Sequence, residues 1–482
     1  MKGDRHILIL ALCSLFFVLT SCREYTLSED PSLRLKFSCD TLSFDTVFTA
    51  QGSATAQLMV YNPNANALSI ERVELAQGTA FHVNVDGEAD LSRLTDLQIN
   101  GGDSLFVFVR VHIDPLNGNN PLLVNDRIQF HLSNGQTQQV ELEAYGQNVT
   151  RLGSKGLTTV DSYVFTDTLP YIVFDTLQIE GPLTIQAGAR IYMHQNACII
   201  AKGDVDAQGS LEQPILIRGD RLDRLFDSVP YLYAGGGWNG IYLLSDQACT
   251  YTFRYVDILS GNVGLFCSST CQGTLPTLTM DGCRIHNHTK YGLVLYHVDA
   301  EVVNSEISNC ASHCVYTQGG AHHFIHSTIA SYFGYTNIRI QNTDKEDVAA
   351  VCIYAADSVM NTSTSFYNSI VTGYRTDEVS IKIDTTATQY AGAFVGNYLK
   401  TDTTIQALFP NNRYWQKTDT TEVFVNDFYR YKEYIYYDFR PDSLSPVIGI
   451  GDSVAAIPYP TDRNGYSRAG LKPDAGCYQY QP

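Results

Sequence analysis

The sequence predicts an all-β protein in which a β-sandwich precedes a stack of parallel β-coils. Its 482 residues include 31 Tyr and 36 Gly but only 5 Met, and 17% are charged, which is typical of β-rich exported proteins. Short segments of alternating apolar and polar residues fill the first third of the chain. A 22-residue repeat then begins near residue 282, which indicates stacked structural units.

The N-terminus has the form of an export signal, residues 1–21. Lys2 and Arg5 precede an apolar stretch over residues 7–19, which is shorter than the roughly 20 residues that a membrane-spanning helix needs. The stretch ends in Leu19-Thr20-Ser21-Cys22, which resembles a bacterial lipobox. That resemblance implies cleavage before Cys22, lipidation of its thiol and anchoring in the outer membrane, on the periplasmic or the outer side. An ordinary secretory signal is the alternative.

Net charge limits the possible binding partners, and cysteine content limits the possible disulfide bonds. The formal net charge is −18, and phosphate contacts need clustered Lys and Arg, so we expect no nucleic-acid partner. Twelve cysteines include Cys13 and Cys22, and the other ten are too sparse for a disulfide scaffold, so no pairing is assigned. No later segment is apolar enough to span a membrane.

The first predicted domain is a β-sandwich over residues 36–148, preceded by a polar tether at residues 22–35. Short strands alternate with turns such as Ser133-Asn134-Gly135-Gln136, and Leu105–Ile113 is expected to be buried on nearly both faces. The order of segments resembles the immunoglobulin-like modules of bacterial surface proteins, which usually serve as spacers. The matching segments are Asn62-Pro63, Leu68-Ser69-Ile70, Gly101-Gly102, Phe106–Val111 and Asp114-Pro115.

The second predicted domain begins near residue 160. Leu183–Gly188, Ala207–Ser210 with Pro214-Ile215, and Trp238–Ile241 occur in the order seen in the first coils of right-handed parallel β-helix proteins of the pectate-lyase type, which they resemble. The resemblance implies a right-handed parallel β-helix over residues 160–380. Pro214 is expected to open a strand, where its missing N–H is tolerated.

The 22-residue repeat supports this prediction from within the sequence. Residues 282–287, 304–309 and 326–330 align at successive offsets of 22. Stacked coils would place Ile285, Ile307 and Ile329 over one another in the core, and would place Asn287 over Asn309 in a side-chain ladder. Ten or eleven coils at the strand spacing would give a rod roughly 50 Å long.

The C-terminal residues resemble the end of a β-helix protein. Residues 438–451 and 473–480 are similar to two closing signatures of such proteins, so residues 381–482 are expected to form terminal coils and a cap. Together with the lipobox and the sandwich, these motifs resemble surface lipoproteins common in Bacteroidetes-type bacteria.

The search for catalytic residues assigns none. Asn342-Thr343-Asp344 is similar to part of a polygalacturonase motif, but the paired aspartate and the Gly-His-Gly that would follow are missing. Asp281 and Glu301 would be diagonal neighbours on adjacent coils, as a calcium-dependent lyase needs. Arg284 stacked on Glu306 is better interpreted as a surface ion pair.

The histidine-rich stretch raises the possibility of a metal site. Seven of the twelve histidines lie between residues 286 and 326, and the offset of 22 places His288 on Cys310, a pair that suits zinc. The register supplies no third or fourth ligand, so we predict no metal and no cofactor.

Aromatic residues beside a glycine-rich loop are the candidate ligand-binding residues. Tyr231, Tyr233 and Trp238 border residues 234–237, and exposed rings there could stack on a sugar. Packing in the core is the alternative for each ring.

The expected function is a non-catalytic binding, adhesion or scaffold role at the cell envelope, with the membrane, through Cys22, and a polysaccharide or another envelope protein as partners. A polysaccharide lyase or glycoside hydrolase of the β-helix class is the alternative. Clustered, partly buried carboxylates would favour the enzyme, and an exposed aromatic groove would favour binding.

Overall fold

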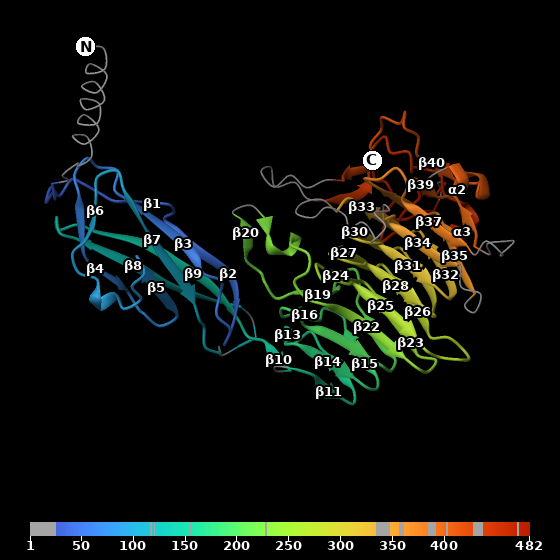
Figure 1. The fold of residues 1–482 in the computed structure, drawn as a ribbon, viewed down its shortest axis with the longest axis horizontal. Coiled ribbons are helices and arrows are strands. Elements are labelled where there is room, and N and C mark those ends of the chain that lie inside the picture. The colour runs from blue at the N-terminus through green and yellow to red at the C-terminus, as the bar shows by residue number, and fades with distance from the viewer. Residues whose placement is uncertain are drawn as a thin grey trace, which may run out of the picture. The chain divides into compact units, whose positions relative to one another are not determined.

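The computed structural model describes residues 26–115, 118–119, 121–153, 156–226, 229–333, 348–355, 361–383, 392–401, 403–427, 437–469 and 472–482. Cys22 and the tripeptide Asn342-Thr343-Asp344 lie outside these residues, so both interpretations stay predictions. The chain divides after Asn148 into two compact units (Figure 1). Within the described part of the chain, no helix combines the length and apolar character needed to cross a membrane.

The first unit is a sandwich of two sheets. The four-stranded sheet has the order β1 (Lys36–Phe37), β3 (Ala56–Tyr61), β7 (Ser104–Val111), β5 (Phe81–Val85). The five-stranded sheet has the order β2 (Thr41–Phe48), β9 (Thr137–Gln147), β8 (Leu122–Leu132), β4 (Leu68–Leu75), β6 (Leu97–Ile99), and a 3-10 turn η1 spans Leu91–Arg93. All pairs are antiparallel except β2 with β9. Alternate residues such as Leu58, Val60 and Phe130 form the core.

Two expectations for this unit are corrected. Strand β7 is buried on one face only, since Phe106 and Phe108 remain 45% and 39% exposed on the other. Residues 26–35 do not run free as a tether, because Ser28 N–H donates to Ala67 O at 3.0 Å and Asn134 Nδ2 donates to Asp30 O at 2.8 Å. The chain therefore joins the sandwich before residue 36.

The second unit is a parallel β-helix with three sheets, each named here by its first strand. The β10 sheet contains β10 (Thr150–Leu152), β13 (Tyr171–Val173), β16 (Arg190–Met193), β19 (Ile215–Gly219), β24 (Val256–Leu259), β27 (Arg284–His288), β30 (Glu306–Cys310), β33 (Thr328–Ser331), β36 (Ile370–Gly373), β39 (Tyr398–Leu399) and β40 (Arg413–Tyr414). The β11 sheet contains β11 (Thr158–Val160), β14 (Thr176–Ile179), β17 (Cys198–Ala201), β22 (Gly240–Ser245), β25 (Leu265–Ser269), β28 (Leu293–Tyr296), β31 (Val315–Gln318), β34 (Val351–Ala355) and β37 (Val379–Ile383). The β12 sheet contains β12 (Tyr163–Phe165), β15 (Leu183–Gln186), β18 (Val205–Gln208), β23 (Thr250–Arg254), β26 (Thr277–Asp281), β29 (Asp299–Val303), β32 (Gly320–Ile325), β35 (Thr362–Tyr367) and β38 (Phe394–Val395).

The register follows the sequence repeat. Ile285 pairs with Ile307 and Ile307 with Ile329, and all three side chains are fully buried in the core of the rod. Asn287 and Asn309 lie at equivalent positions near the ends of β27 and β30, with φ of 65° and 52°, a conformation that asparagine tolerates. Their amides form no ladder, because Asn287 Nδ2 bonds to Leu232 O and Asn309 Oδ1 accepts from Tyr332 N–H.

The two ends of the rod differ from the expected boundaries. The coils begin at Thr150, before residue 160, and the last strand of the rod is β40. Residues 437–482, here called the return segment, do not form further coils. They lie against earlier strands: Arg463 bonds to Asp257 of β24, and Cys477 N–H donates to Thr328 of β33 at 3.0 Å.

The remaining elements lie outside the coils. The connection between β19 and β22 carries the short pair β20 (Arg224–Phe226) and β21 (Val229–Pro230) and the 3-10 turn η2 (Tyr231–Tyr233). After the last coils come β41 (Phe424–Asn426) and β42 (Asp438–Pro441), which pair antiparallel. Helices are short: α2 spans Thr403–Leu408 and α3 spans Ser453–Ala456.

Candidate functional site

A row of aromatic side chains lies on the outer face of the β11 sheet. The register places Ile200, Tyr242, Phe266, Val294 and Tyr316 in succession on β17, β22, β25, β28 and β31. Their neighbours in each strand, such as Ile241 and Leu265, point into the core. Strand alternation therefore turns these residues outward, and three of the five, Tyr242, Phe266 and Tyr316, carry a ring.

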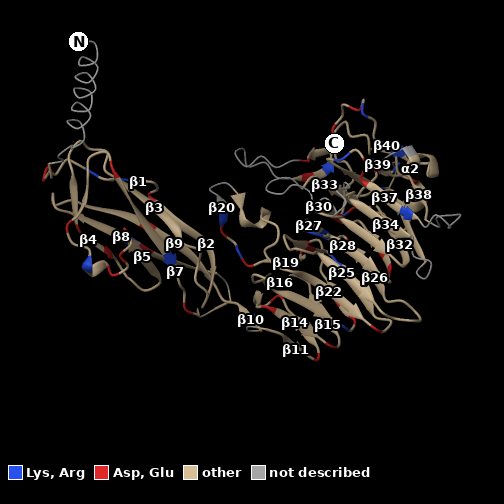
Figure 2. Cartoon of the chain, viewed as in Figure 1, with Lys and Arg blue, Asp and Glu red and all other residues tan. Residues whose placement is uncertain are grey.

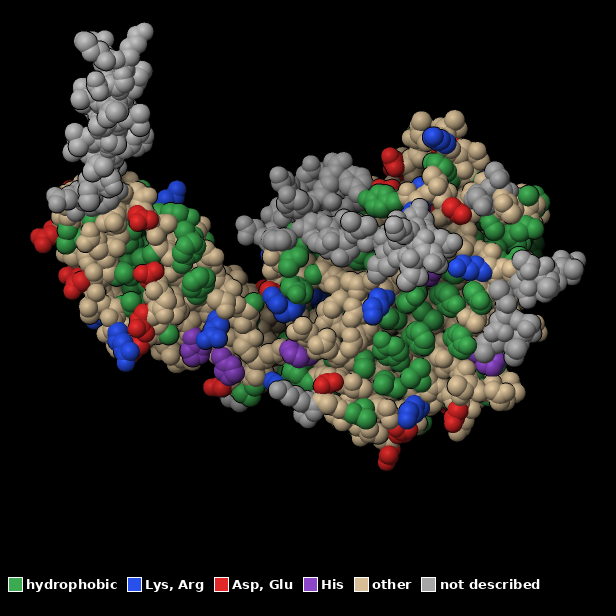
Figure 3. All heavy atoms as spheres, viewed as in Figure 1, with side chains coloured by type: hydrophobic (Ala, Val, Ile, Leu, Met, Phe, Trp, Pro, Cys, Tyr) green, Lys and Arg blue, Asp and Glu red, His purple; other side chains and the backbone are tan. Residues whose placement is uncertain are grey.

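Further rings widen this row into a surface. We call it the aromatic face, and its members, all partly exposed, are Tyr242, Phe266, Tyr291, Tyr296, His313 and Tyr316. Ring centroids lie 5.8 Å apart for Tyr242 and Phe266, and 6.0 Å apart for His313 and Tyr316. Figure 3 shows hydrophobic side chains, tyrosine included, gathered on the side of the rod that carries these strands.

The aromatic face carries no formal charge on its strands. The outward residues of β22, β25, β28 and β31 are Tyr242, Leu244, Phe266, Ser268, Val294, Tyr296, Tyr316 and Gln318. Figure 2 draws the ribbon of the labelled strands β22 and β25 in tan, the colour of uncharged residues. Burial raises the pKa of Tyr316 to about 12, so its hydroxyl stays protonated and donates to Gln318 Oε1 at 2.8 Å. None of these eight outward residues therefore carries a charge at physiological pH.

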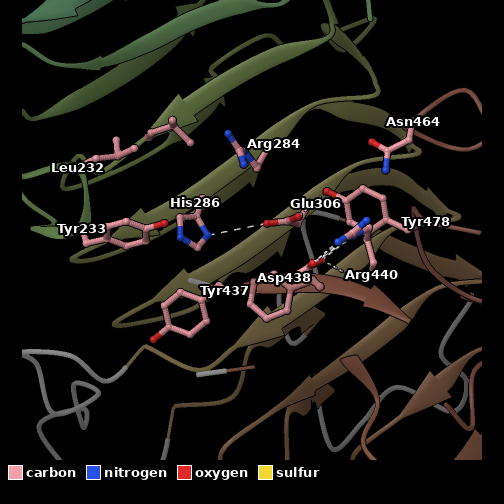
Figure 4. A pocket seen from close by; sticks show the side chains of 12 residues that line it. Leu232, Tyr233, Arg284, His286, Glu306, Tyr437, Asp438, Arg440, Asn464 and Tyr478 are labelled. Carbon is pink, nitrogen blue, oxygen red and sulfur yellow. Dashed lines mark hydrogen bonds and ion pairs between the residues drawn. The ribbon is translucent and has the colours of Figure 1, made fainter. Parts of the chain in front are cut away.

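A pocket of about 190 Å³ lies on the outer side of the β10 sheet. We call it the β27 pocket, because β27 supplies Arg284 and His286. Its other lining residues come from β24, β30, the β19–β22 connection and the return segment, and are Leu232, Tyr233, Leu259, Glu306, Tyr437, Asp438, Phe439, Arg440, Asn464 and Tyr478 (Figure 4).

Hydrogen bonds hold the polar walls of the β27 pocket. Glu306 is buried, and its carboxylate accepts from Ser308 Oγ and from Tyr478 Oη, each at 2.7 Å. Arg284 donates to Asp257 at 2.8 Å and does not pair directly with Glu306, although the two residues stack in register. The expected Arg284–Glu306 surface ion pair is therefore replaced by separate, partly buried contacts. Asp438 is held by Arg440.

A second pocket of about 280 Å³ surrounds the glycine-rich loop. It is lined by Tyr231 and Gly235–Gly237 together with His194, Arg218 and Arg221. The Arg221 guanidinium lies 4.2 Å from the centre of the Tyr231 ring and also donates to Asp223 at 2.6 Å. Both pairings tie these groups to the loop itself.

The structure separates the three predicted ligand-binding residues. Tyr231 lines the loop pocket and Tyr233 lines the β27 pocket. Trp238 is fully buried, and its indole N–H donates to Leu259 O at 2.9 Å, so the prediction that it meets a ligand is wrong. Its large ring fills the core beneath the loop, which is the usual position of a tryptophan in a β-rod.

The candidate catalytic and metal residues that the structure describes are engaged in separate contacts. Register pairs Glu301 with Thr279, so Asp281 is its diagonal neighbour; Asp281 faces Arg254, and Glu301 accepts from Tyr459. His288 does stack on Cys310, but its Nδ1 accepts from Gly261 N–H and its Nε2 bonds to Ile258 O. Both nitrogens are thus engaged. Across the described ranges, no three His, Cys, Asp or Glu side chains are grouped to hold a metal.

The sequence analysis did not predict the aromatic face, although a pattern in the sequence indicates it. The segments Gly240-Ile241-Tyr242-Leu243, Gly264-Leu265-Phe266-Cys267 and Gly292-Leu293-Val294-Leu295 share one pattern. Their third residues alternate with core positions and so must point outward. The β27 pocket has no such signal, because its walls come from distant segments.

Comparisons with known proteins give no family. No family model and no curated protein matches the chain. Among solved structures, the VesB protease of Vibrio cholerae is 14% identical with a TM-score of 0.18, over 23% of this chain and 31% of its own. A PapD-like domain of human CEP192 is 13% identical with a TM-score of 0.18, over 27% of this chain and 95% of its own. A family 123 glycoside hydrolase from Clostridium perfringens is 7% identical with a TM-score of 0.18, over 24% of this chain and 26% of its own.

Likenesses this low carry no functional argument, and the chain spans under a third of the protease and of the hydrolase. The class of protein therefore rests on the strands themselves. The chain is an all-β protein with long all-parallel sheets, consistent with a β-helix, behind a sandwich-like unit.

Proposed function

We propose that this protein is a cell-envelope lipoprotein that binds a neutral polysaccharide on the aromatic face without cleaving it. The single observation behind the proposal is the uncharged row of partly exposed rings along successive coils of the β11 sheet. Sugar rings present C–H faces that pack on aromatic faces, while their hydroxyls bond to flanking polar groups such as Gln318.

The geometry of the rod suits an extended chain. Adjacent strands are spaced by about 4.8 Å, which is close to the length of one sugar unit in an extended polysaccharide. Consecutive sugars can then meet consecutive coils, and many weak contacts add along one ligand. A neutral glycan is favoured because the outward residues of these four strands include no cation to pair with an acidic sugar, and a formal net charge of −18 repels polyanions.

The proposed location rests on the N-terminal sequence. The lipobox-like Leu19–Cys22 is the basis for lipidation of Cys22, which would attach the protein to the outer membrane. The membrane and the polysaccharide are thus the proposed partners. The sandwich would then act as a spacer between the anchor and the β-helix.

A polysaccharide lyase or glycoside hydrolase remains the second candidate, because Glu306 and Asp438 both line the β27 pocket. Acid–base cleavage needs one carboxyl group free to protonate and one free to attack or activate water. Glu306 already accepts two hydrogen bonds, and Asp438 is held by Arg440. These contacts favour a structural role for both carboxylates.

Affinity electrophoresis of the purified full chain through gels that contain neutral or acidic polysaccharides tests the proposal. We expect at least one neutral polysaccharide to retard the protein, and Phe266→Ala with Tyr316→Ala to abolish the retardation. Tyr374→Ala, at an exposed ring away from the face, is the matched control. Retardation that survives the double variant, or none with any neutral glycan, would overturn the proposal. Reducing-end release from the retarding glycan would instead support the enzyme.

A further inference from the structure

The β27 pocket has the size of a single sugar ring. A cavity of about 150 Å³ is enough to hold one benzene molecule, and the β27 pocket measures about 190 Å³. Larger ligands usually occupy pockets of roughly 300 Å³ or more. A six-membered ring with part of its substituents at the mouth therefore fits this space.

Aromatic rings and polar groups share the walls of the pocket. Tyr437 and Phe439 stack with centroids 5.8 Å apart, and the His286 ring lies 5.8 Å from Tyr437. In Figure 4 the His286 imidazole lies between Tyr233 and the Glu306 carboxylate. A few polar groups set among rings are typical of sites that orient a small polar ligand.

The hydrogen bonds around His286 leave one ring nitrogen as an acceptor. Ser308 Oγ donates its only proton to Glu306, so it must accept the proton of His286 Nδ1, which lies 2.8 Å away. The neutral ring then carries no proton on Nε2. Burial lowers the pKa of His286 to about 3, which keeps the ring neutral. Nε2 is thus available to accept a hydrogen bond from a hydroxyl group.

A donor is also available in the same pocket. Arg284 does not present its Nε there, because that atom is enclosed by protein, and one of its terminal nitrogens binds Asp257. The side-chain amide of Asn464 makes no hydrogen bond to the described residues, and only its backbone N–H is engaged, with Asp462. This partly exposed amide is the donor that a ligand in the pocket can reach.

The charged groups in and behind the wall of the pocket are equal in number and lie close together. Asp257 binds both Arg284 and Arg463, Glu306 lies beside Arg284 in register, and Asp438 binds Arg440. Three arginines thus face three carboxylates. An added charge would have no counter-ion, and its desolvation would be uncompensated.

We propose that the β27 pocket binds one neutral pyranose ring, either a free sugar or a terminal or branch unit of a glycan. Hydroxyl groups both donate and accept, so they complement the Asn464 amide donor and the His286 Nε2 acceptor together. This site lies on the β10 sheet and shares no residue with the aromatic face on the β11 sheet. It relies on the proposed function only for the class of ligand.

Saturation-transfer NMR on the purified full chain tests this site with free D-glucose, D-galactose, D-mannose and N-acetyl-D-glucosamine, with D-glucuronate as the charged probe. We expect a neutral sugar to bind with a millimolar Kd. Asn464→Ala should weaken binding about fivefold, the loss of one hydrogen bond, and Asn464→Trp, which fills the mouth, should abolish it. Asn464 is partly exposed and its amide supports no other residue, so neither variant should unfold the chain.

The control Tyr316→Ala separates this proposal from the previous one. It should abolish retardation by polysaccharide gels and leave the monosaccharide signal unchanged, whereas Asn464→Trp should leave retardation in place. The pocket proposal is overturned if no neutral sugar gives a signal, if the signal survives Asn464→Trp, or if only D-glucuronate binds. None of these results bears on the aromatic face.

Discussion

The Tyr478 hydroxyl donates a 2.7 Å hydrogen bond to Glu306 Oε2, and this contact joins two residues that are 172 positions apart. Both side chains are buried, and Ser308 donates to the other carboxylate oxygen. The contact fastens the return segment across the outer side of the β10 sheet and closes one wall of the β27 pocket. It links the stability of the C-terminus to the integrity of that pocket.

Removal of this hydroxyl should loosen the return segment. Tyr478→Phe leaves the packing of the ring intact but removes one donor to a buried carboxylate, which typically costs about 1.5–3 kcal/mol. We expect the unfolding free energy from urea titration to fall by that amount, and amide exchange to accelerate in residues 474–480. Tyr480→Phe, whose hydroxyl makes no hydrogen bond to the described residues, is the control and should change neither quantity.

Acid should destabilise the β-helix through its buried histidines. Burial lowers the pKa of His288 to about 3 from its usual 6.5. Between these two pH values the ring is protonated in the unfolded chain and neutral in the folded chain. The unfolding free energy is therefore unaffected by this group above pH 6.5, and it falls as the pH decreases from 6.5 toward 3. Between pH 7 and pH 5 the loss from one such histidine is about 2 kcal/mol.

His288→Gln therefore should flatten the pH dependence of the unfolding free energy between pH 6.5 and pH 4. The measurement is urea unfolding at several pH values, with the exposed His323→Gln as control. A slope that is identical in wild type and His288→Gln would mean that the ring is already accessible to protons.

The close stacking of coils leaves no room for a side chain at Gly292. A Cβ on Gly292 would lie 2.5 Å from Cys314 O and 2.8 Å from Ile307 Cγ2, whereas a Cβ on Gly273 would meet nothing within 4 Å. We expect Gly292→Ala to destabilise the fold by about 1–3 kcal/mol or more, and Gly273→Ala to have little effect. Equal unfolding midpoints for the two variants would contradict the register of β28 with β31.

The core of the rod was predictable because its signal is local and repeated. The offset of 22 residues set Ile285 over Ile307 and Ile307 over Ile329, and the structure confirms both pairs. In-register stacking requires a similar residue at the same position of each coil. The residues that contact one another therefore recur at a fixed spacing in the sequence. The aromatic face obeys the same alternation, but variable coil lengths hide it: Tyr242, Phe266 and Val294 are 24 and 28 residues apart.

The return segment and the pocket beneath it were not predictable in this way. Cys477 meets Thr328 across 149 residues and Arg463 meets Asp257 across 206, and no periodic pattern relates these pairs.

The position of Trp238 was predicted wrongly for a different reason. Its glycine-rich neighbours are typical of an exposed loop, but the ring itself packs inward, where it removes a large apolar surface from water.

The most direct test of the central claim is hydroxyl-radical footprinting of the purified full chain, with and without the neutral polysaccharide that retards it most strongly. Tyr242, Phe266 and Tyr316 should become protected from oxidation, while the exposed reference rings Tyr145 and Tyr374 should not. Protection confined to those three rings would place the glycan on the aromatic face. Unchanged oxidation of all three in the presence of bound polysaccharide would contradict the account.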